Sequence, residues 1–167
     1  MYTIHGTKKL LDRVKKPVGE AVETPSTALG NWCATALFWR PQAALFVNER
    51  TLLPVFVPLA PAAKVAKRLP DQLGRVLDAL DVPIEFTLQE TAVMESANFA
   101  KTANRSVVGS MNDFAFLAEH HLAGGFPHDL LGLSLRMAGT PCGSLRKRHG
   151  FPDRELLAFV DEVMGGR

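Results

Sequence analysis

The sequence predicts a single α+β domain, in which about five helices pack on a small, mostly antiparallel sheet. Three apolar runs between residues 32 and 59 are joined by turns of a few residues, which is typical of an antiparallel meander. Longer segments beyond residue 62 repeat apolar residues at spacings of three and four, the period of amphipathic helices. The 167 residues suit one domain with a buried core and are few for two.

At the start of the chain, residues 2–5 are predicted to be extended and to lead into a short helix. Thr7 can cap this helix, and its apolar side chains are those of Leu10, Leu11 and Val14. Proline and glycine recur over residues 17–30, so we expect a loop there that is long enough for a role in binding.

The predicted meander comprises residues 32–39, 43–47 and 52–59. The first run is apolar almost throughout, which is compatible with a strand covered on both faces. Pro54 and Pro58 have no N–H to donate to a neighbouring strand, so the third run is expected at an edge of the sheet.

The segment 62–80 is the longest predicted helix, because its apolar residues form one stripe. Pro70 interrupts the segment, so we expect either a kink or two helices, the second beginning at Pro70. Residues 84–100 are ambiguous, because 84–88 alternates like a strand and 91–99 fits either type.

Three further helices are predicted in the last third of the chain. The first covers residues 110–122, with Ser110 as its cap. The second covers 128–137. The third covers 152–164 and begins with Pro152, a residue common in the first turn of helices.

The densest polar stretch, residues 101–113, leads into the first of these helices. It combines two cations, hydroxyl and amide groups and a glycine. Free N–H groups and the helix dipole attract anions at a helix N-terminus, so the stretch predicts a phosphate or carboxylate site. The candidate ligand-binding residues are Lys101, Asn104, Arg105, Ser106, Gly109 and Ser110.

The same stretch also has a simpler interpretation as a turn into a helix. Ser110 then caps the helix, Gly109 allows a tight turn, Asn104 forms an Asx-turn, and Lys101 and Arg105 are solvated. No Gly-Lys-Ser/Thr follows a spaced glycine, so the stretch is not a Walker A loop. The two interpretations both stay open.

Histidines and a cysteine supply the other candidates for chemistry. His120 and His121 end the helix, where the helix dipole favours a positively charged imidazolium. Adjacent side chains point about 100° apart on a helix, so these two histidines cannot chelate one metal ion, and we expect no metal site. Cys142 precedes a basic run that could lower its pKa, and His128 or His149 could serve as its base. No known signature surrounds Cys142, so an inert loop cysteine is the simpler interpretation.

Composition excludes several classes of protein. Hydrophobic residues make up 47% and charged residues 22% of the chain, so it is neither disordered nor fibrous. No apolar run approaches the about 20 residues that span a bilayer, and the first residues lack a signal-peptide core. Two cysteines, Cys33 and Cys142, indicate neither a disulfide framework nor a zinc site. We therefore expect a soluble cytoplasmic protein with no membrane partner.

The charge is nearly balanced, with 19 Lys and Arg against 17 Asp and Glu, which argues against a dedicated nucleic-acid binder. The basic residues gather near the two ends of the chain, which would form one basic face only if the fold joined them. They are Lys8, Lys9, Arg13, Lys15, Lys16, Arg146, Lys147, Arg148 and Arg154.

Several segments resemble a family of small, uncharacterised bacterial proteins. They are residues 7–11, Asn31-Trp32 with Ala34, residues 45–48 and, above all, residues 101–113. The resemblance covers about residues 1–122, and it implies a bacterial cytoplasmic origin but no activity and no residue role. Residues 123–167 lie outside it and are expected to form a helical extension that packs on the core or on a partner.

Three classes of function stay open. The absence of a recognised catalytic or dinucleotide motif favours a binding or regulatory module, whose partner is an anionic small molecule, an RNA or an acidic protein surface. A small enzyme for a phosphorylated or acyl substrate would use Lys101 and Arg105 to stabilise charge, with a histidine or Cys142 as acid, base or nucleophile. A toxin–antitoxin or defence pair would dock through residues 123–167. The sequence predicts neither a cofactor nor an oligomeric state.

Overall fold

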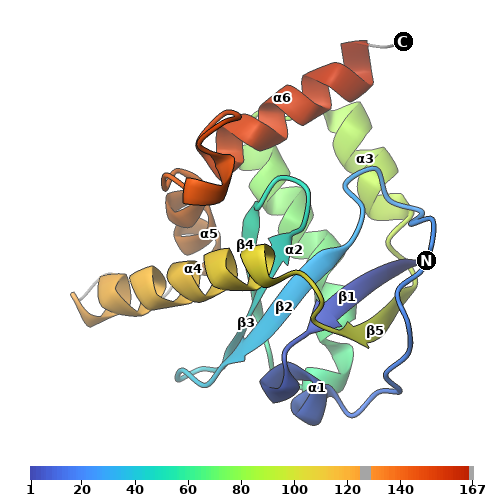
Figure 1. Ribbon diagram of the computed structural model, residues 1–167, viewed down its shortest axis with the longest axis vertical. Helices are drawn as coiled ribbons and strands as arrows, with labels where there is room; N and C mark the ends of the chain where they lie inside the picture. Colours follow the sequence, from blue (N-terminus) through green and yellow to red (C-terminus); the bar gives the residue numbers. More distant parts are fainter. Residues whose placement is uncertain (125–128, 166–167) are drawn as a thin grey trace.

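A five-stranded mixed sheet forms the centre of the protein, as seen in the computed structural model, which describes residues 1–124 and 129–165 (Figure 1). The strands are β1 (Tyr2–Gly6), β2 (Trp32–Leu37), β3 (Ala43–Asn48), β4 (Pro54–Pro58) and β5 (Ala97–Lys101), in the spatial order β4-β3-β2-β1-β5. The helices are α1 (Lys8–Val14), α2 (Val65–Ala79), α3 (Ile84–Ala92), α4 (Arg105–Ala123), α5 (Leu130–Ala138) and α6 (Pro152–Gly165).

The α+β class is confirmed, but the sheet is mixed rather than mostly antiparallel. The strands β2, β3 and β4 form the predicted antiparallel meander, and β4 lies at an edge as its prolines require. The strand β1 runs parallel to both β2 and β5. A long connection through α1 joins β1 to β2, and such a connection lets neighbouring strands run in the same direction, whereas tight turns reverse it.

The ambiguous segment 84–100 divides between a helix and a strand, because residues 84–92 form α3 and residues 97–100 belong to β5. The segment that alternates like a strand belongs to α3, because Phe86, Thr87 and Glu90 face inward at helical spacing while Ile84 and Leu88 are exposed. The helix α2 begins at Val65, after a 3₁₀ turn, and continues past Pro70. Of the two alternatives for this segment, the prediction of two helices divided at Pro70 is therefore wrong.

The helix α4 begins at Arg105, earlier than predicted. Asn104 is the cap, because its Oδ1 accepts the N–H groups of Ser106 (3.1 Å) and Val107 (3.2 Å). Ser110 and the glycine before it therefore lie inside the helix and form neither a cap nor a turn. The prediction of Ser110 as a cap is wrong because the polar residues before it are themselves helical.

The short helix α1 follows Thr7 as predicted, with Leu10 and Val14 buried. Thr7 does not cap it through its side chain, because the Thr7 Oγ1 lies 2.8 Å from the Thr35 Oγ1 on β2. The predicted loop over residues 17–30 is also present, and only Val18 forms an isolated bridge there, to Phe99 of β5.

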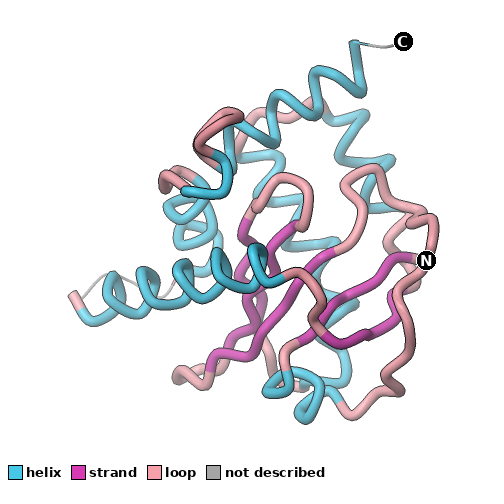
Figure 2. Tube along the Cα trace, viewed as in Figure 1, coloured by secondary structure: helices cyan, strands magenta, loops and turns pink. Residues whose placement is uncertain are grey.

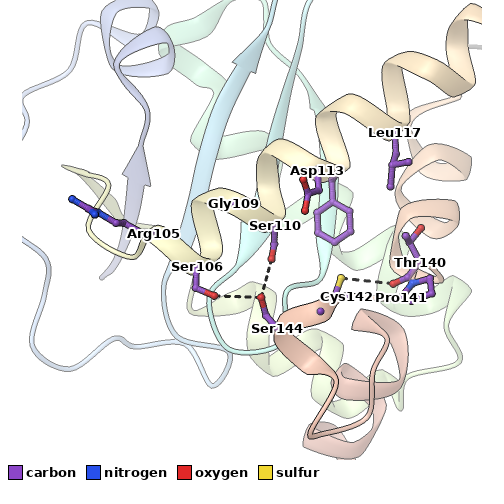
Figure 3. Close-up of a pocket in the computed structure, with 12 residues that line it drawn as sticks. Arg105, Ser106, Gly109, Ser110, Asp113, Leu117, Thr140, Pro141, Cys142 and Ser144 are labelled. Carbon is purple, nitrogen blue, oxygen red and sulfur yellow. Dashed lines mark hydrogen bonds between the residues drawn. The ribbon is translucent and has the colours of Figure 1, made fainter.

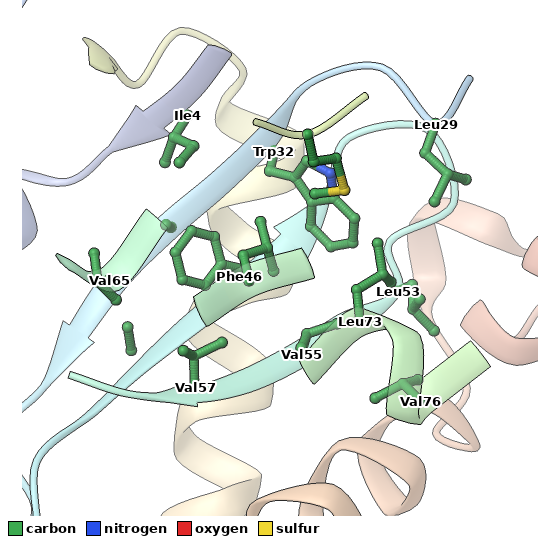
Figure 4. Packing of buried hydrophobic residues seen from close by; sticks show 14 of the residues in the cluster. Ile4, Leu29, Trp32, Phe46, Leu53, Val55, Val57, Val65, Leu73 and Val76 are labelled. Carbon is green, nitrogen blue, oxygen red and sulfur yellow. The ribbon is translucent and has the colours of Figure 1, made fainter. Parts of the chain in front are cut away.

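Helices cover both faces of the sheet, so the core has two parts (Figure 2). The first cluster lies between the sheet and α1, α2, α3 and α6, and Figure 4 shows Trp32 and Phe46 of the sheet packed with Leu73 and Val76 of α2. The second lies between the sheet and α4 and α5. The strands β2 and β3 are buried along their whole length, which explains why they are apolar on both faces.

The C-terminal helices are part of this core. Leu133 and Met137 of α5 belong to the second cluster, and Leu156 and Val160 of α6 belong to the first. Ser134 of α5 also provides a hydrogen-bond partner for the edge strand, because its Oγ accepts the N–H of Phe56 of β4 at 2.9 Å. The segment after residue 122 thus packs on the core. In the part of the chain described, none of the helices has the length and apolar character needed to cross a bilayer.

Candidate functional site

The first half of α4 presents a polar face. Ser106 lies three and four residues before Gly109 and Ser110, and Asp113 lies four and three residues after them, so the four residues share one side of the helix. Val107, Met111 and Phe114 lie about 100° further round the helix and pack in the second cluster. The helical period thus places an apolar face, which fixes the helix on the core, beside the polar face.

The segment after α5 forms a wall opposite this face. Leu145 is buried in the second cluster and so attaches the segment to the core. The N–H of Cys142 donates to the Gly150 carbonyl at 2.9 Å, which closes the segment into a loop. Gly150 has a φ of 83°, a left-handed conformation that glycine adopts without strain. The fold thereby places Ser144 with its Oγ 3.3 Å from the Ser106 Oγ and 3.4 Å from the Ser110 Oγ (Figure 3).

A cavity of about 290 Å³ lies between the two walls. We call it the hydroxyl pocket. Its lining consists of Arg105, Ser106, Gly109, Ser110, Asp113, Phe114, Leu117, Thr140, Pro141, Cys142, Gly143 and Ser144. Both distances from the Ser144 Oγ exceed the usual O–H···O length of about 2.7–2.8 Å, so Ser144 interacts weakly with the other two hydroxyls and all three can bond a ligand.

The structure divides the predicted site residues between two places. Arg105, Ser106, Gly109 and Ser110 line the hydroxyl pocket, although Arg105 lies at its margin and its side chain extends away from the serines (Figure 3). Lys101 does not join them.

Lys101 ends β5 and lines a separate hollow beside α1. The Asn104 side chain is occupied in capping α4, which also uses two N–H groups of the first turn. Hydroxyl groups, rather than free backbone N–H groups, are therefore the main donors of the hydroxyl pocket.

Cys142 lies in the hydroxyl pocket, but its surroundings do not activate it. Burial, and then the negative charge of Asp113, raise the pKa of the thiol to about 11. The expectation that the following basic run lowers this pKa is therefore wrong. Part of that run is engaged elsewhere, since the Arg148 guanidinium forms an ion pair with Glu155.

No histidine among the described residues lines the hydroxyl pocket. The His149 Nδ1 lies 2.8 Å from the Glu155 Oε2, and His120 and His121 lie in the last turn of α4. His128, the other proposed base for Cys142, lies outside the described residues, as does the start of the helix predicted at 128. In the described ranges, no three His, Cys, Asp or Glu side chains form a possible metal-ligand set.

Sequence reasoning missed several polar contacts. The His5 Nδ1 lies 2.6 Å from the Glu49 Oε1. Glu90 is buried, accepts the N–H groups of Ala28 (2.7 Å) and Leu29 (2.9 Å), and has its pKa raised by burial. Each of these contacts joins residues more than 40 positions apart, so no local pattern could have indicated them.

The two basic segments do not form one face. The first lies on and after α1, at the bottom of the view in Figure 1, and the second lies in the segment before α6 and in the first turn of α6, in the upper part of that view. They are separate charged surfaces, so the single basic face that would form if the fold joined the two ends of the chain is not present among the described residues.

The fold and the pocket define an α+β protein with a mixed sheet, both faces of which are covered, and a small polar cavity between a helix and a loop. The chain belongs to the family described as Domain of unknown function (DUF6933), whose model matches residues 3–155. This match confirms the resemblance to an uncharacterised family, and it extends past residue 122 to include α5 and the start of α6. No curated protein and no solved structure matches the chain.

Proposed function

We propose that this protein is a binding module that holds a small anionic ligand in the hydroxyl pocket. The observation that carries the proposal is the convergence of Ser106, Ser110 and Ser144 from two distant segments. Three hydroxyls directed at one point can donate to the oxygens of a phosphate or carboxylate. The volume of about 290 Å³ suits a small molecule.

Charge at the pocket supports an anion at one end. Arg105 has no ion-pair partner among the described residues, and it lies in the first turn of α4, where the helix dipole is positive. Asp113 lies two turns further along and repels an anion there. A ligand with an anionic group near Ser106 and a hydrogen-bond donor near Asp113 would satisfy both charges.

Binding is better supported than catalysis by Cys142. A thiol with a pKa of about 11 is almost wholly protonated at neutral pH, and the thiolate is the nucleophile. A bacterial cytoplasmic setting is part of this proposal, and the two free cysteines, Cys33 and Cys142, suit a reducing compartment.

The test is an NMR titration of ¹⁵N-labelled protein with inorganic phosphate and with acetate. We expect the amide signals of Ser106 and Ser144 to shift. A hydrogen bond to a charged group contributes about 1.5–3 kcal/mol, so Ser144→Ala should weaken binding about tenfold or more. Arg105→Ala should have the same effect, because the exposed Arg105 side chain can turn toward an anion bound at the serines. Both side chains are exposed, so the Tm should hardly change.

Arg75→Ala is the matched control, because Arg75 is an exposed arginine on α2, away from the hydroxyl pocket. It should leave the affinity unchanged. The proposal is wrong if neither anion shifts the Ser106 and Ser144 signals, or if Arg105→Ala and Arg75→Ala bind equally. A large fall in Tm for Arg105→Ala would instead identify a structural arginine.

A further inference from the structure

A second hollow lies where two parallel strands end. Gly6 of β1 and Lys101 of β5 are register partners, so the carboxyl ends of these strands lie side by side. The chain then leaves β1 into α1, whose Leu10 packs in the first core cluster, and leaves β5 into α4, whose Met111 packs in the second. The two connections therefore diverge to opposite faces of the sheet (Figure 1).

Divergence of this kind opens a crevice, and open α/β sheets bind their ligands at such a point. The crevice here has a volume of about 510 Å³. Its lining consists of Gly6, Lys8, Leu11, Asp12, Val18, Lys101 and Thr102. It shares no lining residue with the hydroxyl pocket, so the two sites can be distinguished residue by residue.

One part of the crevice is apolar and firmly held. Leu11 is half-buried, and Val18 is 46% exposed. The chain beside Val18 is attached to β5, because the N–H of Gly19 donates to the Phe99 carbonyl at 2.8 Å. Leu11 packs closely on Gly6, since a Cβ at Gly6 would lie 2.9 Å from a methyl carbon of Leu11.

The other part of the crevice carries an uncompensated positive charge. The Lys8 Nζ is paired with the Asp12 carboxylate at 2.8 Å. Lys101 has no ion-pair partner in the described ranges, and the Thr102 hydroxyl beside it is a further donor. An ammonium group and a hydroxyl group suit a phosphate, which Lys binds as a point charge.

We infer that the crevice at the carboxyl ends of β1 and β5 is a second ligand site, which takes a phosphomonoester with an apolar organic group. The phosphate lies against Lys101 and Thr102. The apolar group lies against Leu11 and Val18. This inference stands on the crevice alone and does not need the hydroxyl pocket to bind anything.

Phenyl phosphate is the probe, because it joins a phosphate to an apolar ring, and inorganic phosphate is the comparison. In NMR titrations of the full chain, phenyl phosphate should shift the amide signals of Gly6 and Thr102 and bind at least about fivefold more tightly than inorganic phosphate at these residues. Lys101→Ala should weaken both ligands about tenfold. Val18→Thr should weaken phenyl phosphate severalfold and leave inorganic phosphate unchanged.

Lys67→Ala, which removes an exposed lysine of α2, is the matched control and should bind like the parent protein. The inference is overturned if phenyl phosphate leaves the Gly6 and Thr102 signals unshifted, if both phosphates bind equally there, or if Lys101→Ala behaves like Lys67→Ala. Shifts confined to Ser106 and Ser144 would overturn this inference and leave the proposed function intact. Lys101 and Val18 are exposed, so both variants should fold.

Discussion

Ser134→Ala should destabilise the protein far more than the loss of one surface hydroxyl would. Ser134 is fully buried, and its Oγ accepts the N–H of Phe56 on the outer side of the edge strand β4 at 2.9 Å. The same hydroxyl donates to the Leu130 carbonyl at 2.7 Å. Alanine keeps the helix but provides no acceptor, so the Phe56 N–H becomes a buried, unsatisfied donor.

The magnitude follows from the groups left behind. An unsatisfied buried N–H costs about 1–3 kcal/mol. The Leu130 carbonyl keeps its intrahelical bond, and alanine recovers about 0.5 kcal/mol of helix propensity relative to serine. The net loss is about 1–2 kcal/mol, which for a domain of this size lowers Tm by about 2–8 °C.

Urea unfolding followed by far-UV circular dichroism measures the loss, and hydrogen exchange of the Phe56 amide measures its cause. Exchange at Phe56 should accelerate more than exchange at its strand neighbours. Ser106→Ala is the control, since Ser106 is an exposed helical serine and should change stability by less than about 0.5 kcal/mol. Equal stabilities for the two variants, with unchanged exchange at Phe56, would refute the role assigned to Ser134.

Two predictions concern titrating groups. Alkylation of Cys142 by iodoacetamide should be slow at pH 8, and its rate should rise with pH with a midpoint near the thiol pKa of about 11. Asp113→Asn should lower that midpoint. A midpoint near that of a free thiol would contradict the burial of the Cys142 side chain. Burial raises the pKa of Glu90 above its ordinary value near 4.5, so the folded state binds this proton more tightly than the unfolded state. The contribution of Glu90 to stability should therefore be complete below about pH 4.5 and be lost as pH rises through the folded pKa. Urea unfolding between pH 4 and 8 should show this slope in the parent protein and not in Glu90→Gln, and identical slopes would exclude Glu90 as its source.

Local patterns predicted the elements that local physics determines. Pro54 and Pro58 placed β4 at an edge because proline cannot donate within a sheet, and the apolar stripe of α2 followed the helical period. The parallel pairing of β1 with β5 joins segments more than 90 residues apart, such as Thr3 and Asn98, and no local pattern encodes it. The strand-like alternation at 84–88 left this segment ambiguous, because Phe86 occupies an inward position in either a strand or a helix.

For the candidate site, the sequence indicated one wall of the hydroxyl pocket but not the geometry of the pocket. Moving the start of α4 from Ser110 to Arg105 changes which residues share a face: Ser106, Ser110 and Asp113 come together, and Lys101 stays on β5. Ser144 of the opposite wall lies 34 residues beyond Ser110, and the sequence marked this wall only through Cys142, with nothing to indicate that it faces the helix. The wrong direction for the Cys142 pKa has the same origin, because the burial of the thiol, and then its proximity to Asp113, arise only through the fold.

The two proposed sites depend on different parts of the chain, and this separates them experimentally. The crevice is built from residues 6–18 and 101–102, whereas the hydroxyl pocket also needs the loop that carries Ser144. Gly150 closes that loop with a φ of 83°, and no atom lies within 4 Å of the position of an added Cβ. Gly150→Ala therefore strains only the backbone, by about 1–2 kcal/mol.

Gly150→Ala should accordingly weaken inorganic phosphate at Ser144 and leave phenyl phosphate at the crevice unchanged. Gly165→Ala, also in open space but without a positive φ, is the matched control and should affect neither site. Amide shifts at Ser144 and at Thr102 give the two affinities from the same titrations. Equal losses at both sites would mean that the loop and the crevice form one coupled unit, contrary to the separate linings from which the two sites are inferred.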